Sequence, residues 1–156
     1  LASAEIGNIS DRRVYLALDG NSPGVPKLLM KDTGINSGYM ILQYTTAALA
    51  SENKGLCFPS SADSIPTSLG QEDHVSMGAN AATKCKRLID NVEKVLAIEL
   101  LTAVQALEFR RPLKSSPVIE QIVQNFRRQV SFIDADRILR VDMMKAVAFI
   151  QEYPPL

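Results

Sequence analysis

The sequence has 156 residues, of which 46% are hydrophobic and 22% are charged, a composition that excludes a largely disordered chain. Its 17 basic residues balance 17 acidic ones. This balance argues against nucleic acid or an anionic membrane as the main partner, because both require a concentrated basic surface. We therefore expect one domain that is large enough to bury a core.

The first half of the chain predicts two helices, each followed by a loop. Residues 1–18 carry apolar side chains on one ragged side of a helix, and a run of Gly, Pro, Asn and Asp follows them. Residues 36–53 predict the second helix, in which Asn36 or Ser37 accepts hydrogen bonds from the first turn. Residues 59–70 are rich in Ser, Thr, Pro and Gly, which predicts a loop of the kind on which sites are often built.

A long helix is predicted over residues 73–109, capped near Asp73 and ending before Pro112. At 1.5 Å per residue it spans about 55 Å, whereas a compact domain of this size is about 40 Å across. Its second half, residues 95–109, is apolar on most sides and should be buried on most sides. We expect this chain to have too few residues to surround it, so partner chains or other segments should cover it and the chain should self-associate.

Two shorter helices are predicted near the end of the chain. Ser116 is suited to cap the first of them, with Pro117 at the first helical position. Apolar residues keep a helical spacing from there to Ile133. Asp142 is suited to cap the last helix, which residues 153–155 (Tyr-Pro-Pro) should end.

These elements predict an all-α fold: an elongated helical bundle with one long central helix, in a single domain over residues 1–156. Residues 1–110 would form the core helices and the active-site loop, and residues 111–156 the C-terminal helices. No segment has the two-residue alternation of a paired strand. No apolar run reaches the ~18–20 residues of a membrane span, so we expect no membrane partner.

Cysteine and histidine are scarce. Cys57 and Cys85 are too few for a disulfide framework, and we expect two reduced thiols in a cytoplasmic protein. His74 is the one histidine. A zinc site would need nearly all of these side chains to converge, so we expect no metal site.

The densest polar cluster is formed by Gln71, Glu72, Asp73 and His74, and three interpretations compete. The cluster could cap the long helix, since acidic residues in a first turn stabilise its positive end. Alternatively, Glu72 could exchange a proton with a substrate. A Glu–His relay to a nucleophile is disfavoured, because no nearby Ser, Cys or Lys is identifiable as the nucleophile.

Residues 36–40 (Asn-Ser-Gly-Tyr-Met) form a second candidate. Gly38 could allow close backbone approach, and Met40 could line a pocket with its polarizable side chain. The alternative is a helix start with a core methionine.

An ordered set of segments carries a resemblance to a known family. The chain resembles the C-terminal part of the histidine ammonia-lyases, members of the aromatic amino-acid ammonia-lyase and aminomutase family, from about residue 1 to residue 110. The matching segments are GINSGYM (34–40), TTAALASENK (45–54), DSIPTS (63–68), QEDHVSMG (71–78) and VLAIELL (95–101).

The resemblance implies an all-α homotetramer whose active sites draw residues from several subunits. It implies elimination of ammonia from L-histidine to give trans-urocanate. The electrophile of the family is a methylidene-imidazolone ring formed from an internal Ala-Ser-Gly, and no external cofactor is needed.

Two positions match functional residues of the family. Glu72 matches the glutamate that faces the substrate imidazole, a position that is usually glutamine in the phenylalanine and tyrosine enzymes. Met40 matches a methionine lining the side-chain pocket. Gln71, Asp73 and His74 belong to the same motif in supporting roles. Gly70 stands where the family commonly has Asn.

No Ala-Ser-Gly occurs in the 156 residues. We therefore expect this chain to be the C-terminal portion of a longer enzyme and to be inactive alone. Two alternatives stay open: a lyase or aminomutase for another aromatic amino acid, and a non-catalytic helical assembly module.

Overall fold

A computed structural model describes residues 1–153, and every regular element within that range is helical. Two isolated β-bridges are the only strand-like pairings in the described part, so the all-α prediction is confirmed. The elements are α1 (Ala2–Leu18), η1 (Lys27–Leu29), α2 (Met40–Leu56), η2 (Ser68–Gly70), α3 (Gly78–Phe109), α4 (Pro117–Arg127) and α5 (Leu139–Glu152).

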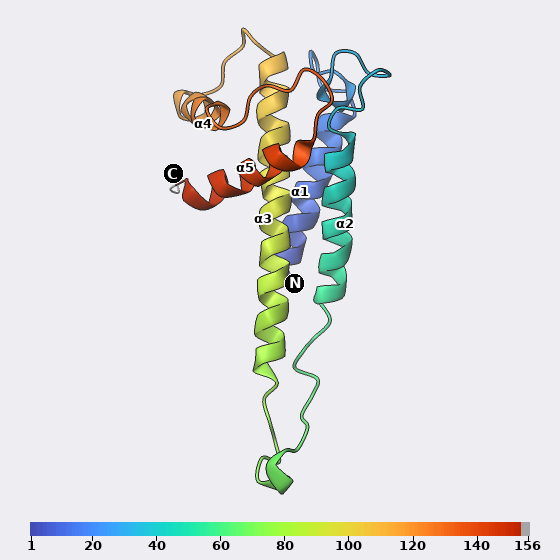
Figure 1. Cartoon of the computed structure of the whole chain (residues 1–156), viewed down its shortest axis with the longest axis vertical. Coiled ribbons are helices and arrows are strands. Elements are labelled where there is room, and N and C mark those ends of the chain that lie inside the picture. Colours follow the sequence, from blue (N-terminus) through green and yellow to red (C-terminus); the bar gives the residue numbers. More distant parts are fainter. Residues whose placement is uncertain (154–156) are drawn as a thin grey trace.

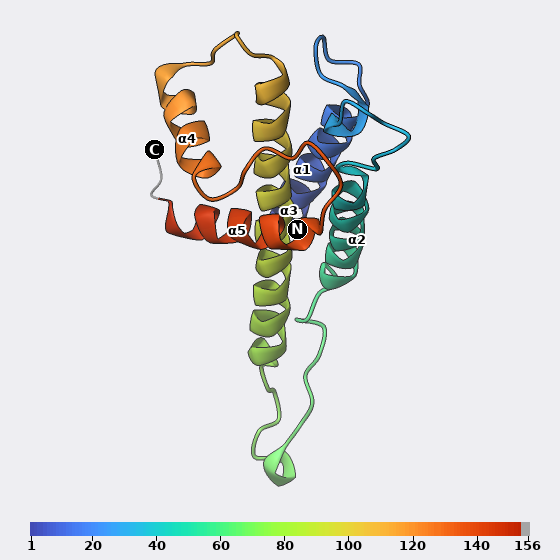
Figure 2. The same cartoon turned by 45° about the horizontal axis from the view of Figure 1, so that its top comes forward.

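The helices form an elongated bundle around α3 (Figure 1). Helices α1 and α2 lie alongside α3, and α5 packs across it. Figure 2 shows α5 crossing α3 at a steep angle, with α4 next to the C-terminal half of α3. The segment between α2 and α3 extends beyond the other helices as a long loop.

The predicted long helix is confirmed as α3, but its predicted start at Asp73 is wrong. It begins at Gly78 and has 32 residues, a length of about 48 Å. Residues before it are held in a non-helical loop, in which the backbone N–H and C=O of Glu72 bond those of Thr67. Asp73 therefore caps no helix, and the capping interpretation of residues 71–74 is wrong.

Much of the apolar second half of α3 is covered by this chain itself, contrary to prediction, although Leu96, Leu100, Leu107 and Phe109 are only partly buried. Val95, Ile98 and Leu101 are fully buried, because α1, α2 and α5 all pack against the helix. The apolar surface left exposed is smaller than predicted, and self-association stays a prediction. The part of the molecule that does project is the opposite end, where the first turns of α3 and the loop before it are exposed.

Helix α4 begins as predicted and ends earlier than predicted. The Ser116 hydroxyl accepts a hydrogen bond from the Ile119 N–H at 3.4 Å, and proline follows at the first helical position. The helix ends at Arg127, yet Ile133 beyond it is buried. Gln105 of α3 replaces the helical bonds of that residue, since its amide donates to the Ile133 carbonyl at 2.7 Å and accepts from the Ile133 N–H at 3.3 Å.

The prediction that Asp142 caps the last helix is also wrong. Helix α5 begins at Leu139, so Asp142 lies inside its first turn. The buried carboxylate accepts two hydrogen bonds from Arg137, at 3.0 and 2.7 Å. Tyr153 follows the last helical residue, and residues 154–155 lie outside the described range.

A distant aspartate holds the start of α2. Neither Asn36 nor Ser37 caps the helix, which begins at Met40. Instead, the Asp136 carboxylate accepts hydrogen bonds from the Ser37 and Gly38 N–H groups, both at 2.8 Å. The Asp136 N–H in turn donates to the Asn36 side-chain oxygen at 3.1 Å. These bonds anchor the entry of α2 to the segment before α5.

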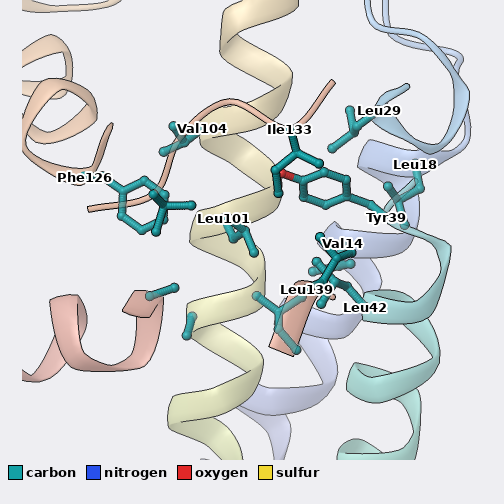
Figure 3. Packing of buried hydrophobic residues seen from close by; sticks show 14 of the residues in the cluster. Val14, Leu18, Leu29, Tyr39, Leu42, Leu101, Val104, Phe126, Ile133 and Leu139 are labelled. Atoms are coloured by element: carbon teal, nitrogen blue, oxygen red, sulfur yellow. The ribbon is translucent and has the colours of Figure 1, made fainter. Parts of the chain in front are cut away.

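The main core lies where α1, α2 and α5 meet the second half of α3 (Figure 3). Tyr39 points from the start of α2 toward Ile133 in this core. Its hydroxyl has no hydrogen-bond partner among the described residues. Burial raises the pKa of the Tyr39 phenol well above its ordinary value, against the opposing effect of the Arg127 guanidinium.

Candidate active site

The polar motif lies on the loop that projects from the bundle. Thr67 and Glu72 exchange two backbone hydrogen bonds, at 3.0 and 3.3 Å, which close a small ring at the loop tip. Ser68, Leu69 and Gly70 fill the ring with φ angles of 56°, 59° and 89°. Glycine and asparagine tolerate such angles best, so Gly70 keeps a turn that the family's usual Asn would also allow.

Ser64 ties the two legs of the loop together. Its hydroxyl oxygen accepts a hydrogen bond from the Val75 N–H at 3.1 Å and lies 3.2 Å from Nδ1 of His74. A hydroxyl can donate one hydrogen bond and accept two, so Ser64 can bond both Val75 and the His74 ring at the same time.

From the sequence, Ser64 was only one of several serines near the polar cluster, and it was not identified as a functional residue. Its contact with His74 gives the pair expected of a nucleophile and a base. However, no described residue bonds Nε2 to orient the imidazole, and Ser64 already accepts a backbone bond. The pair is therefore better suited to fixing the loop than to nucleophilic catalysis.

Glu72 presents its carboxylate to solvent. The side chain is exposed, and no ion pair or side-chain hydrogen bond joins it to another described residue. Gln71, Asp73 and His74 are exposed on the same loop, so the structure brings these four predicted residues together. An unpaired carboxylate on a structured turn is able to accept a hydrogen bond from a cationic or N–H-bearing ligand.

The structure does not bring Met40 to this cluster. Met40 is the first residue of α2, and Glu72 lies beyond the opposite end of that helix (Figure 1). Since α2 has 17 residues, the two positions are more than about 25 Å apart. Within one chain, Met40 and Glu72 cannot contact the same small ligand.

Each end of the molecule has its own groove. Beside the start of α2, a groove of about 530 Å³ is lined by residues of α2, of α5 and of the segment that carries Asp136. Along the projecting loop, a groove of about 370 Å³ is lined by Ser64, His74 and Met77, among others. Neither groove is lined by Met40 or Glu72. Within residues 1–153, no cluster of His, Cys, Asp and Glu has the arrangement of a metal site.

The fold and the loop define a class of protein: long antiparallel helices that present a polar loop beyond one end of the bundle. Among the described helices, none is long and apolar enough to cross a membrane. The model of the family described as aromatic amino acid lyase matches residues 1–128. The chain belongs to the aromatic amino acid lyase family.

Relatives of known identity agree with this assignment. The chain is 50% identical to the histidine ammonia-lyase of Desulfotalea psychrophila over 97% of its own length and 30% of the relative's. It is also 50% identical to the Vibrio cholerae histidine ammonia-lyase, again over 97% of its length and 30% of the relative's. The chain thus spans about 30% of the length of the curated relatives it matches.

Solved structures share the fold. The histidine ammonia-lyase of Trypanosoma cruzi matches with a TM-score of 0.90 and 41% identity, over 95% of this chain and 29% of that one. A tyrosine aminomutase from Streptomyces globisporus matches with a TM-score of 0.89 and 30% identity, over 96% of this chain and 29% of that one. The aminomutase is the more distant of the two in sequence.

Proposed function

We propose that this chain is the C-terminal portion of an enzyme that eliminates ammonia from L-histidine to give trans-urocanate. The observation that carries the proposal is the Glu72 carboxylate, held on a bridged turn and free of ion pairs within the described residues. A carboxylate suits an imidazole, because it accepts the ring N–H and stabilises the imidazolium. The 50% identity to histidine ammonia-lyases supports the same substrate.

The methylidene-imidazolone group of the family would supply the electrophile that activates the substrate amine for departure. Its Ala-Ser-Gly precursor does not occur in this sequence, so another part of the protein would have to provide it. The exposed, unpaired Glu72 fits a position opposite such a group, where it would bind the substrate imidazole and could hold a proton. No external cofactor is part of the proposal.

The proposed site is composite and belongs to a homotetramer in the cytoplasm. Met40 would line the side-chain pocket and Glu72 would face the imidazole, while Gln71, Asp73 and His74 would support the loop. Because Met40 starts α2 and Glu72 lies beyond the other end of that helix, they can serve one site only if different copies contribute them. Histidine turnover would then require assembly.

Replacing Glu72 with glutamine in the longer protein tests the substrate. The amide keeps the size of the side chain and loses the charge that stabilises an imidazolium, so we expect kcat/KM for L-histidine to fall at least about tenfold. Steady-state urocanate formation measures it. Asp63→Asn, a matched loss of charge on the same loop, should leave turnover unchanged.

Histidine turnover that is unaffected by Glu72→Gln would contradict the proposal. A gain of activity on tyrosine or phenylalanine in the same variant would favour the alternative assignment to another aromatic amino acid. The isolated chain is expected to give no urocanate, since it contains no precursor of the electrophile.

Mixed oligomers test whether different copies supply Met40 and Glu72. Met40→Ala and Glu72→Gln should each abolish most turnover when present in every subunit of the longer protein. Co-expression of the two variants should restore about a quarter of the wild-type turnover, because random mixing leaves some sites with both native residues. If one chain supplied both residues to a site, no site would be intact and mixing would restore nothing.

A further inference from the structure

Both cysteines of the sequence line one groove. The groove has a volume of about 180 Å³ and lies where the start of α1, the end of α2 and the first turns of α3 meet. Cys57 directly follows the last residue of α2, and Cys85 lies in the exposed part of α3. Both are free thiols. No role in the proposed histidine chemistry uses this groove.

The pairing of α2 with α3 sets the two cysteines opposite each other. Asn91 of α3 donates a side-chain hydrogen bond to Asn53 of α2 at 3.1 Å. Further along, the Lys84 ammonium donates to the Phe58 carbonyl. The helices run antiparallel, so residue numbers rise on α2 as they fall on α3. Cys57 precedes Phe58 and Cys85 follows Lys84, which places the two cysteines at the same level of the helix pair.

The side-chain directions agree with this register. Ala81, Cys85 and Leu88 share one side of α3, since they are spaced by four and three residues, and all three line the groove. Cys57 packs against the small apolar cluster that contains Leu88. Cys57 is half-buried and Cys85 is exposed, so a reagent can reach one thiol from solvent while the second lies at the wall of the same groove.

We propose that Cys57 and Cys85 form a dithiol that a low-molecular-weight disulfide, such as oxidised glutathione, converts to an intrachain disulfide. One protein thiolate attacks the reagent disulfide and releases one reduced thiol, which leaves a mixed disulfide on the protein. The second protein thiolate attacks the protein sulfur of that mixed disulfide and releases the other reduced thiol. The protein loses two protons and two electrons, and the reagent gains them.

The position of Cys57 favours closure of the bond. A disulfide requires Cα atoms within about 7 Å. Cys57 is the residue at which the chain leaves α2, and its N–H donates to the Lys54 carbonyl at 3.2 Å. An adjustment of its backbone toward α3 would therefore affect only the last turn of the helix. The bond would close the base of the loop that carries Glu72, without contact with Glu72 itself.

Thiol trapping and peptide mapping test the proposal. The folded chain is incubated with excess oxidised glutathione, quenched with an alkylating reagent and digested without reduction. We expect a product that has lost two hydrogens, carries no glutathione and yields a cross-linked peptide containing Cys57 and Cys85. Cys57→Ser and Cys85→Ser should each retain one glutathione on the remaining thiol.

A parallel reaction in denaturant separates proximity in the fold from proximity along the chain. The second step, from mixed disulfide to intrachain disulfide, should be about tenfold faster in the folded chain, because the fold raises the effective concentration of the second thiol. Equal rates in the two conditions would overturn the proposal. A folded chain that accumulates two glutathione adducts, or that forms only dimers linked between chains, would overturn it as well.

Discussion

Replacing Gly38 with alanine is expected to lower the free energy of unfolding by about 3 kcal/mol. Gly38 has a φ of 55°, and a Cβ built there would lie 2.5 Å from the Leu28 carbonyl oxygen. The neighbour is backbone and cannot rotate away, so the entry of α2 would have to move. That movement would also pull the Gly38 N–H from Asp136, which it bonds at 2.8 Å. Urea unfolding followed by circular dichroism measures the change.

Gly24→Ala is the matched control for this substitution. Gly24 has a φ of 77°, but nothing lies within 4 Å of its built Cβ. Only the backbone conformation is then strained, which costs about 1 kcal/mol. Equal losses at the two positions would show that the close approach to Leu28 is not what makes Gly38 necessary.

Replacing Gln105 with leucine is expected to cost a similar amount, about 3 kcal/mol. Gln105 is fully buried on α3. Its amide bonds both the N–H and the C=O of Ile133, and its oxygen also accepts from Arg127 at 3.2 Å. Leucine has nearly the same volume, so the loss would come from buried polar groups left without partners. Chemical unfolding again measures it.

The control for Gln105 is Gln151→Leu on α5. Gln151 is exposed, and its amide donates to Glu93 at 2.8 Å. Water can replace this bond, so the expected change is below about 0.5 kcal/mol. A stability change at Gln105 no larger than this would mean that the segment around Ile133 is held by apolar packing alone.

Helix existence could be predicted because its signals are local. Ser116 and Pro117 mark a helix start that the structure confirms, and residues 1–18 carry enough apolar residues to predict α1. The predicted helix boundaries are wrong where contacts with residues distant in the sequence determine the local structure. Asp136 binds the backbone before α2 from about a hundred positions away, and no periodicity in the sequence can reveal that contact.

The same distinction explains the extra helical length predicted toward Ile133. The apolar spacing continues past Arg127, but Gln105 supplies the hydrogen bonds that helical neighbours would otherwise make. The one signal in the sequence was Gln105 itself, because a glutamine within an apolar helix needs hydrogen-bond partners when it is buried. The covering of residues 95–109 was missed for a related reason, since the fold-back of α5 across α3 depends on tertiary packing.

The residues of the candidate site stay predictions, and the structure adds where each of them lies. The exposed motif at residues 71–74 does form one polar cluster. Sequence order said nothing about the distance from Met40 to Glu72, because this distance depends on how far the loop after α2 extends from the bundle (Figure 1). In the composite site that we propose, their neighbours would come from other copies and other segments, which the contacts within one chain do not show.

The projecting loop carries the polar motif but contributes little to the stability of the bundle. Residues 61–74 are exposed throughout, and their order rests on the Thr67–Glu72 bridge and on Ser64 rather than on apolar burial. Such a segment opens locally at a small fraction of the global unfolding free energy, so its amides would exchange with solvent long before those of α3. Residues of this loop can therefore be substituted with little effect on the stability of the fold. On the role that we propose for Glu72, substrate choice can change at this position while the bundle beneath stays unchanged.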